Sequence, residues 1–227
     1  MRFLDPANLS RAFRDPITWA ALVVDLIPIY AVLVFGWGAA PLVFLYWLEN
    51  LVIGGVTLAR MIASGASKGG AGIGMILFMC PFFIVHYGMF CFGHGVFLNS
   101  LAFQDFGAME TGNIIIGYGD LIQNALASGA YMPTFILLII AFNVFLFVVD
   151  YIGKGEFLRT DPSKEMFAPY GRIVVLHIAL FVGMFALISF GEPMAGVLAL
   201  ILLRAVWGVI QSIYRRVRLD QKVDAVS

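Results

Sequence analysis

Long apolar runs alternate with short polar segments along the chain, and six of the runs are long enough to cross a membrane. About 20 consecutive apolar residues span the hydrocarbon core of a bilayer as an α-helix. The six runs are residues 17–35, 39–62, 73–103, 133–152, 171–190 and 194–214. The pattern therefore predicts an all-α fold, a polytopic integral membrane bundle of six transmembrane helices in a single domain, residues 1–227.

The segments between the runs differ in length and charge. Residues 1–16 mix arginines with apolar side chains, as in a short interfacial helix, and lack the apolar stretch and cleavage site of a secretory signal peptide. Residues 64–72 are rich in glycine and predict a flexible connection. Residues 104–132 form the one long loop, without Lys or Arg, which we expect to lie on the membrane surface as a periplasmic cover. Residues 215–227 form a basic cytoplasmic tail.

The composition agrees with a membrane protein. Hydrophobic residues make up 61% of the chain, charged residues 12%, and the mean hydropathy is +0.94, whereas soluble domains carry about a quarter charged residues. The 14 basic and 14 acidic residues balance, which indicates no nucleic-acid partner; the lipid bilayer is the expected partner. Apart from Arg204, the Lys and Arg residues lie in or beside the N-terminal segment, the 64–72 and 153–170 connections and the tail. The positive-inside rule then predicts that both termini lie in the cytoplasm.

An acid and an amide, Glu49 and Asn50, lie in the middle of the 39–62 run, within the sequence Tyr-Trp-Leu-Glu-Asn. A carboxylate near the bilayer centre costs about 2.5–3.5 kcal/mol on insertion scales, so it faces the bundle interior and is given a partner. Counted at about 1.5 Å per residue, Glu49 and Arg204 lie at similar depths and are candidate partners. Asp25 is the competing acid. A structural ion pair and a functional one remain equal alternatives.

The three histidines of the chain all lie in apolar runs. His86 and His94 are eight residues apart, about 12 Å along a straight helix, whereas each nitrogen ligand of a zinc ion lies within about 2.1 Å of it. If the neighbouring glycines break the helix, His86, His94 and Glu49 form a candidate zinc or iron site. Otherwise the histidines, with His177, predict a proton or substrate relay, or they are hydrogen-bonded packing residues.

Several kinds of site are disfavoured by the sequence. There is no Gly-x-Ser-x-Gly nucleophile and no His-Glu-x-x-His zinc motif, which argues against serine catalysis and the usual zinc proteases. A haem held by two histidines needs them at one depth, and His86 and His177 differ by roughly 10 Å, so haem is a minor alternative. Cys80 and Cys91, eleven residues apart in one run, are too distant to bridge each other and are expected to be buried free thiols.

Three sequence motifs occur in order along the chain. They are YWLEN at residues 46–50, HYG followed by FGHGVF at residues 86–97, and MFAPYGR at residues 166–172, which leads to His177. Together they resemble a bacterial multi-pass membrane family known only as a domain of unknown function. The resemblance covers nearly all of the chain and implies no activity. The residues that match its pattern are Glu49, Asn50, His86, His94, Arg172 and His177, with Arg204 matching only as a basic residue.

After this resemblance we expect the chain to lie in a bacterial inner membrane, and two classes of function follow from these observations. The first is a membrane-embedded enzyme, dependent on a metal or on protons, whose candidate catalytic residues are Glu49, His86, His94, His177 and Arg204. The second is a small-molecule or proton-coupled carrier or channel that uses the same residues as a path. A non-catalytic membrane scaffold is the third alternative. A hydrophobic or lipid-like substrate and a second copy of the chain, in a homo-oligomer, are the further partners expected.

Overall fold

The computed structural model of the chain describes residues 28, 30–103, 114–171, 173–174 and 178. All regular secondary structure in these residues is helical, which confirms the predicted all-α class for this part of the chain. The chain divides into two compact units, one formed by Met1–Gly36 with Val175–Ser227 and the other by Trp37–Val174. The helices described below belong to the second unit.

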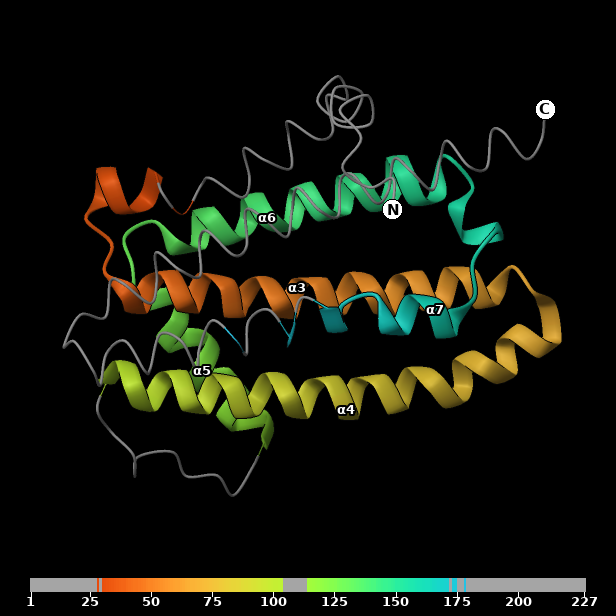
Figure 1. The fold of residues 1–227 in the computed structure, drawn as a ribbon, viewed down its shortest axis with the longest axis horizontal. Helices are drawn as coiled ribbons and strands as arrows, with labels where there is room; N and C mark the ends of the chain where they lie inside the picture. Colours follow the sequence, from red (N-terminus) through yellow and green to blue (C-terminus); the bar gives the residue numbers. More distant parts are fainter. Residues whose placement is uncertain (1–27, 29, 104–113, 172, 175–177, 179–227) are drawn as a thin grey trace, which may run out of the picture. The chain divides into compact units, whose positions relative to one another are not determined.

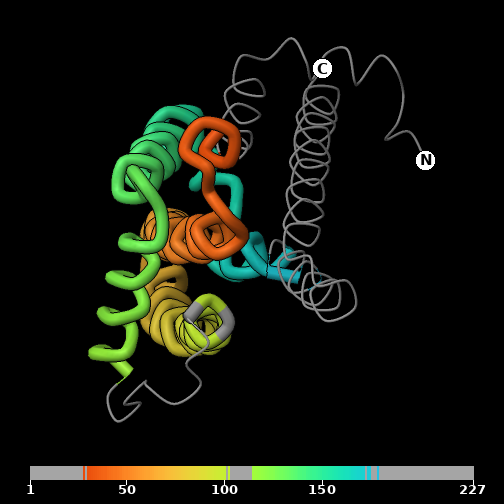
Figure 2. Tube along the Cα trace, turned by 90° about the vertical axis from the view of Figure 1, so that its left-hand side faces the viewer, coloured from red at the N-terminus to blue at the C-terminus, as the bar shows by residue number. Residues whose placement is uncertain are grey.

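Three long helices dominate this unit: α3 (Ala39–Ala66), α4 (Gly69–Phe103) and α6 (Met132–Leu146), which continues directly into the π-helix η1 (Phe147–Ile152). They lie side by side, with α3 between α4 and α6 (Figures 1 and 2). The shorter elements are α5 (Ile114–Ala127), the 3₁₀ turn η2 (Glu156–Leu158) and α7 (Pro162–Phe167).

Within the described residues, three helical stretches are long and apolar enough to cross a membrane: Ala39–Ala66, Gly69–Ser100 and Met132–Ile152. They coincide with the predicted runs 39–62, 73–103 and 133–152, so these three are confirmed as membrane-length helices. The other three predicted runs fall largely outside the described residues. Their number and boundaries therefore stay predictions.

The connection between α3 and α4 differs from the prediction of a flexible segment over residues 64–72. Only Ser67 and Lys68 separate the two helices. Gly69 has a φ of +65°, a backbone conformation that glycine adopts without strain. A Cβ on Gly72 would lie 2.0 Å from the carbonyl oxygen of Gly65. The glycines therefore allow a close helix crossing and a tight turn instead of forming a loop.

Two segments that the sequence places between spans are packed against the long helices. The predicted loop 104–132 contains α5, and the charged connection 153–170 contains η2 and α7. Helix α7 lies beside α3 (Figure 1), and a few residues later the ring centroid of Tyr170 lies 6.0 Å from that of His86 and 6.4 Å from that of Tyr87. The chain therefore returns along α3 and α4 before the predicted start of the next span at residue 171.

Candidate functional site

The YWLEN motif is buried on every side of helix α3. Its five consecutive residues, Tyr46, Trp47, Leu48, Glu49 and Asn50, are each at most 5% exposed. Successive helical residues point about 100° apart, so five buried residues in a row mean that other elements surround α3 at this level. Helices α4 and α6 lie on two sides of α3 (Figure 2).

Trp47 ties this part of α3 to α4. Its indole Nε1 donates a hydrogen bond of 2.7 Å to the backbone oxygen of Cys91. The ring lies over Gly95, where a Cβ would come within 2.7 Å of Trp47 Cζ2 and 2.9 Å of Leu121 on α5. Gly95 is therefore required for the close approach of the indole. The FGHGVF and YWLEN motifs meet at this contact.

Tyr87 makes the second link between the motifs. Its hydroxyl donates a 3.0 Å hydrogen bond to the backbone oxygen of Asn50. A Cβ on Gly54 would lie 2.6 Å from the Tyr87 ring, so α3 has a glycine where the tyrosine packs. The two hydrogen bonds therefore join α3 to α4 on both sides of Glu49, one at Trp47 and the other at Asn50.

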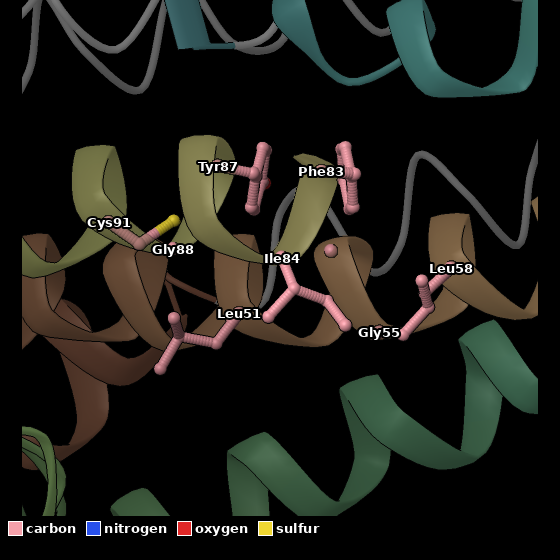
Figure 3. Close-up of a pocket in the computed structure, with 9 residues that line it drawn as sticks. Leu51, Gly55, Leu58, Phe83, Ile84, Tyr87, Gly88 and Cys91 are labelled. Atoms are coloured by element: carbon pink, nitrogen blue, oxygen red, sulfur yellow. The ribbon is translucent and has the colours of Figure 1, made fainter. Parts of the chain in front are cut away.

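An apolar groove of about 160 Å³ opens between α3 and α4 beside these contacts (Figure 3). It is lined from α3 by Leu51, Gly54, Gly55 and Leu58, and from α4 by Phe83, Ile84, Tyr87, Gly88 and Cys91. Cys91 and Tyr87, which bond to the YWLEN motif, also line the groove. Cys80 and Cys91 are free, buried thiols, as the sequence predicts.

His86 lies on a different face of α4 from its neighbour Tyr87. Its side chain is exposed, stacked on Phe82 at 5.3 Å and packed edge-on against Phe90 at 5.2 Å, with Tyr170 at 6.0 Å. Because adjacent helical residues diverge by about 100°, the inward position of Tyr87 turns His86 away from α3. His86 therefore lies among aromatic side chains on a face of α4 that is turned away from α3 and Glu49.

The structure does not bring His86, His94 and Glu49 together. Helix α4 continues without interruption from Gly69 to Phe103, so the glycines do not fold the two histidines toward each other. Within the residues described, no three His, Cys, Asp or Glu side chains form a group that could hold a metal. His94 is half-buried one residue before Gly95. The geometry gives no support to the predicted zinc or iron site.

The remaining candidate residues lie outside the described part of the chain. They are Asp25, Arg172, His177 and Arg204. The Glu49–Arg204 pair and the histidine relay therefore stay predictions.

A second polar cluster, which sequence reasoning did not select as a site, lies at the other end of α3. The Arg60 guanidinium stacks 4.7 Å from the centroid of the Tyr151 ring, and its NH1 nitrogen lies 3.8 Å from Glu165 on α7. The Tyr151 hydroxyl donates to the Arg60 backbone oxygen at 3.1 Å. The buried Asp150 pairs with Lys154 at 2.6 Å. Asp150 and Tyr151 both lie in η1, and π-turns are common at functional sites.

Charged pairs continue this cluster to the α3–α4 turn. Lys68 donates a hydrogen bond to Asp161, just before α7, and Lys164 lies 3.4 Å from the same carboxylate. The hydrogen bond from Lys68 lowers the pKa of Asp161 below its usual value. In the sequence, Asn50, Thr57 and Arg60 fall near one face of a helix, and Asn143 and Asp150 share a face of another, which are the signals from which this cluster could be found.

Comparison with known proteins identifies the family. A family model described as a family of unknown function, DUF6498, matches residues 7–225, and the chain belongs to this family. No curated protein and no solved structure matches the chain.

Proposed function

We propose that this member of the family is a six-span protein of the bacterial inner membrane, with both termini in the cytoplasm, and that it is a membrane-embedded enzyme whose chemistry depends on a proton held by Glu49. Three membrane-length helices at the predicted positions support the topology. The single observation that carries the function is the complete burial of the YWLEN motif around Glu49. Intramembrane carboxylates are rare because they are costly, and they mark proton and substrate sites.

The rigidity of this site favours an enzyme over a carrier. The Trp47–Cys91 and Tyr87–Asn50 hydrogen bonds fix α3 against α4, and Gly95 and Gly54 fit closely under the two rings. Catalytic groups work best when neighbours lock their geometry, whereas a carrier needs helices that move apart around the binding site. Glu49 would exchange a proton with a polar group of the substrate, and the Asn50 amide would orient that group.

The groove beside the motif favours a hydrophobic or lipid-like substrate. Its volume of about 160 Å³ is close to that of an engineered cavity of about 150 Å³ that accepts benzene. A segment of an acyl or isoprenoid chain fits such a space, with its polar end directed toward the YWLEN motif. Two of the groove residues, Tyr87 and Cys91, bond directly to that motif.

Labelling with a membrane-soluble carbodiimide tests the proton-holding role. Such reagents modify protonated carboxyl groups, and mass spectrometry of the purified protein in lipid vesicles would locate the adduct. We expect an adduct at Glu49 that decreases as the pH is raised and is absent from Glu49→Gln. Glu156, outside the membrane-length helices, is the control, which a water-soluble carbodiimide should modify instead. No adduct at Glu49 at any pH would contradict the proposal.

A second measurement separates the enzyme from the carrier. Vesicles made from bacterial lipid extract would be incubated with the wild-type protein or with Glu49→Gln, and their lipids then compared by mass spectrometry. If the protein is an enzyme, the mass of a lipid component should change in vesicles with the wild-type protein and stay the same in vesicles with Glu49→Gln. Movement of protons or solute across the vesicle membrane without any change in lipid mass would favour the carrier.

Cysteine labelling tests the topology. Cysteines introduced at Gly112 and Glu192 should react with an impermeant reagent from the periplasm, and those at Gly155 and Ala225 only from the cytoplasm. Labelling of the Gly155 position from the periplasm would overturn the six-span arrangement.

A further inference from the structure

Helix α5 is anchored to the middle of α4. The Tyr118 hydroxyl donates a hydrogen bond to the backbone oxygen of Gly88, and the Tyr118 ring packs 5.1 Å from the ring of Phe92. Later in α5, the Asn124 amide donates to the side-chain oxygen of Asn99 at 3.0 Å. Helix α5 therefore follows α4 obliquely, with its first turns beside Gly88 and its later turns nearer the end of α4 (Figure 1).

The length of the continuous helix α6–η1 sets a scale for the depth of Gly88 in the membrane. It has 21 residues from Met132 to Ile152, about 31 Å at 1.5 Å per residue, which equals the thickness of the hydrocarbon core. Trp37 marks its first end, because the indole donates to the oxygen of Ala130 at 3.1 Å and packs on Phe135 at 5.1 Å. Tryptophans are typical of this interface.

Gly88 lies about halfway through the membrane on this scale. Helix α3 begins at Ala39, next to Trp37, and reaches Trp47 after eight residues, or about 12 Å. Trp47 bonds to Cys91, and Gly88 is three residues, or about 4.5 Å, farther in. The resulting depth of about 16 Å is half of a core about 30 Å thick.

The first turn of α5 has an exposed apolar surface at this depth. Ile114, Ile115 and Ile116 are 55%, 81% and 60% exposed. The polar side chains of the helix that are exposed come later, at Asp120, Gln123 and Asn124, where α5 has risen toward Trp37. This order, apolar at depth and polar near the interface, is that of a helix entering a bilayer.

We infer that α5 is a re-entrant helix, and that Ile114, Ile115 and Ile116 form a surface whose partner is the lipid acyl chains near the middle of the bilayer. The helix runs from mid-membrane back to the side of Trp37 without crossing the bilayer. This differs from the sequence-based expectation that the segment lies on the membrane surface. Leu121 of α5 packs at the contact of Gly95 with Trp47, so α5 forms a lipid-facing wall of the YWLEN region.

Spin labelling in vesicles of phosphatidylethanolamine and phosphatidylglycerol tests this inference. A nitroxide would be attached to Ile115→Cys and, as a matched control on the same helix, to Gln123→Cys; the wild-type chain gives the background from the two buried native thiols. Power saturation would compare collisions with oxygen, which concentrates in lipid, and with a water-soluble nickel chelate. Both positions are exposed, so neither substitution disturbs a packed side chain.

The expected result is a label at position 115 that collides several-fold more with oxygen than with the nickel chelate, and a reversed ratio at position 123. Equal, high nickel collisions at both positions would overturn the inference by placing α5 in water. Low collisions with both reagents at position 115 would also overturn it, because protein and not lipid would then cover the isoleucines. None of these outcomes depends on the chemistry proposed for Glu49.

Discussion

Helix α3 has two polar regions, and they are held in different ways. Around Glu49 the contacts to α4 are uncharged hydrogen bonds from Trp47 and Tyr87 to backbone oxygens. Around Arg60 the contacts are charged, and they connect α3 to α7 through Glu165 and the α3–α4 turn to Asp161 through Lys68. The first region is fully buried, whereas the Arg60 side chain is 32% exposed and that of Lys68 33%.

The difference favours one of the two regions as the candidate site. Partly exposed pairs near a helix end contribute little to stability individually and are screened by salt; here they hold a returning segment in place. Buried charged groups can often be replaced by apolar residues without loss of stability, so packing alone does not account for the buried Glu49. The enclosed region is therefore the candidate for function, and the Arg60 region the candidate for fastening α7.

The largest expected effect comes from removing the predicted partner of Glu49. Arg204→Met would leave the ionised form of Glu49 buried and unpaired, which should lower the free energy of unfolding in detergent by about 3–5 kcal/mol at a pH where the carboxyl has lost its proton. Adding Glu49→Gln to Arg204→Met should restore part of the loss. Denaturation of the single and double variants checks this, and strictly additive losses would show that the two residues do not touch.

A smaller effect is expected where Trp47 meets α4. Gly95→Ala would place a methyl group 2.7 Å from the indole, and overpacking of this kind costs about 1–3 kcal/mol. Gly93→Ala is the control, because a Cβ there meets nothing within 4 Å, and replacing a helical glycine by alanine should stabilise by about 0.5–1 kcal/mol. Equal melting temperatures of the two variants would mean that the indole is not packed on Gly95.

In the Arg60 region the expected loss is about 1 kcal/mol. Arg60→Met removes a partly exposed ion pair with Glu165 and a stacking contact with Tyr151, each worth up to about 1 kcal/mol and reduced by solvent. Arg60→Lys keeps the charge but not the planar stacking group, so its free energy of unfolding should fall by less than that of Arg60→Met. The loss should shrink in high salt; a salt-independent loss would indicate that packing, not charge, fastens α7.

The sequence predicted the long helices well because each is a continuous apolar run. Its main error, a flexible connection at residues 64–72, has a physical cause. Glycine marks both loops and close helix crossings, and only the backbone positions of Gly65 and Gly72 distinguish the two. Similarly, the apolar Ile114, Ile115 and Ile116 indicated membrane contact, but their depth depends on the hydrogen bond between Tyr118 and Gly88.

The candidate site could be predicted only in part. The buried position of Glu49 followed from the cost of a charge in lipid, and its burial is confirmed. The direction of His86 could not be derived, because nothing in the sequence shows that Tyr87 and not His86 faces α3. The pairing of Arg60 with Glu165 joins segments about a hundred residues apart, which requires knowledge of the fold.

The smallest expected effect concerns the pH dependence of the Lys68–Asp161 contact. Because Lys68 lowers the pKa of Asp161 in the folded protein, the contact stabilises the fold above the unfolded pKa of about 3.9 and loses this contribution as the pH falls through the lowered value. The melting temperature of the wild type minus that of Asp161→Asn should be positive between about pH 5 and 7 and decrease toward zero on acidification below about pH 4. Lys68→Gln should show the same loss at neutral pH, since it removes the other partner. A difference that grows on acidification would have the wrong sign for a carboxylate stabilised in its charged form, and would remove Lys68 from the contacts that hold the segment before α7.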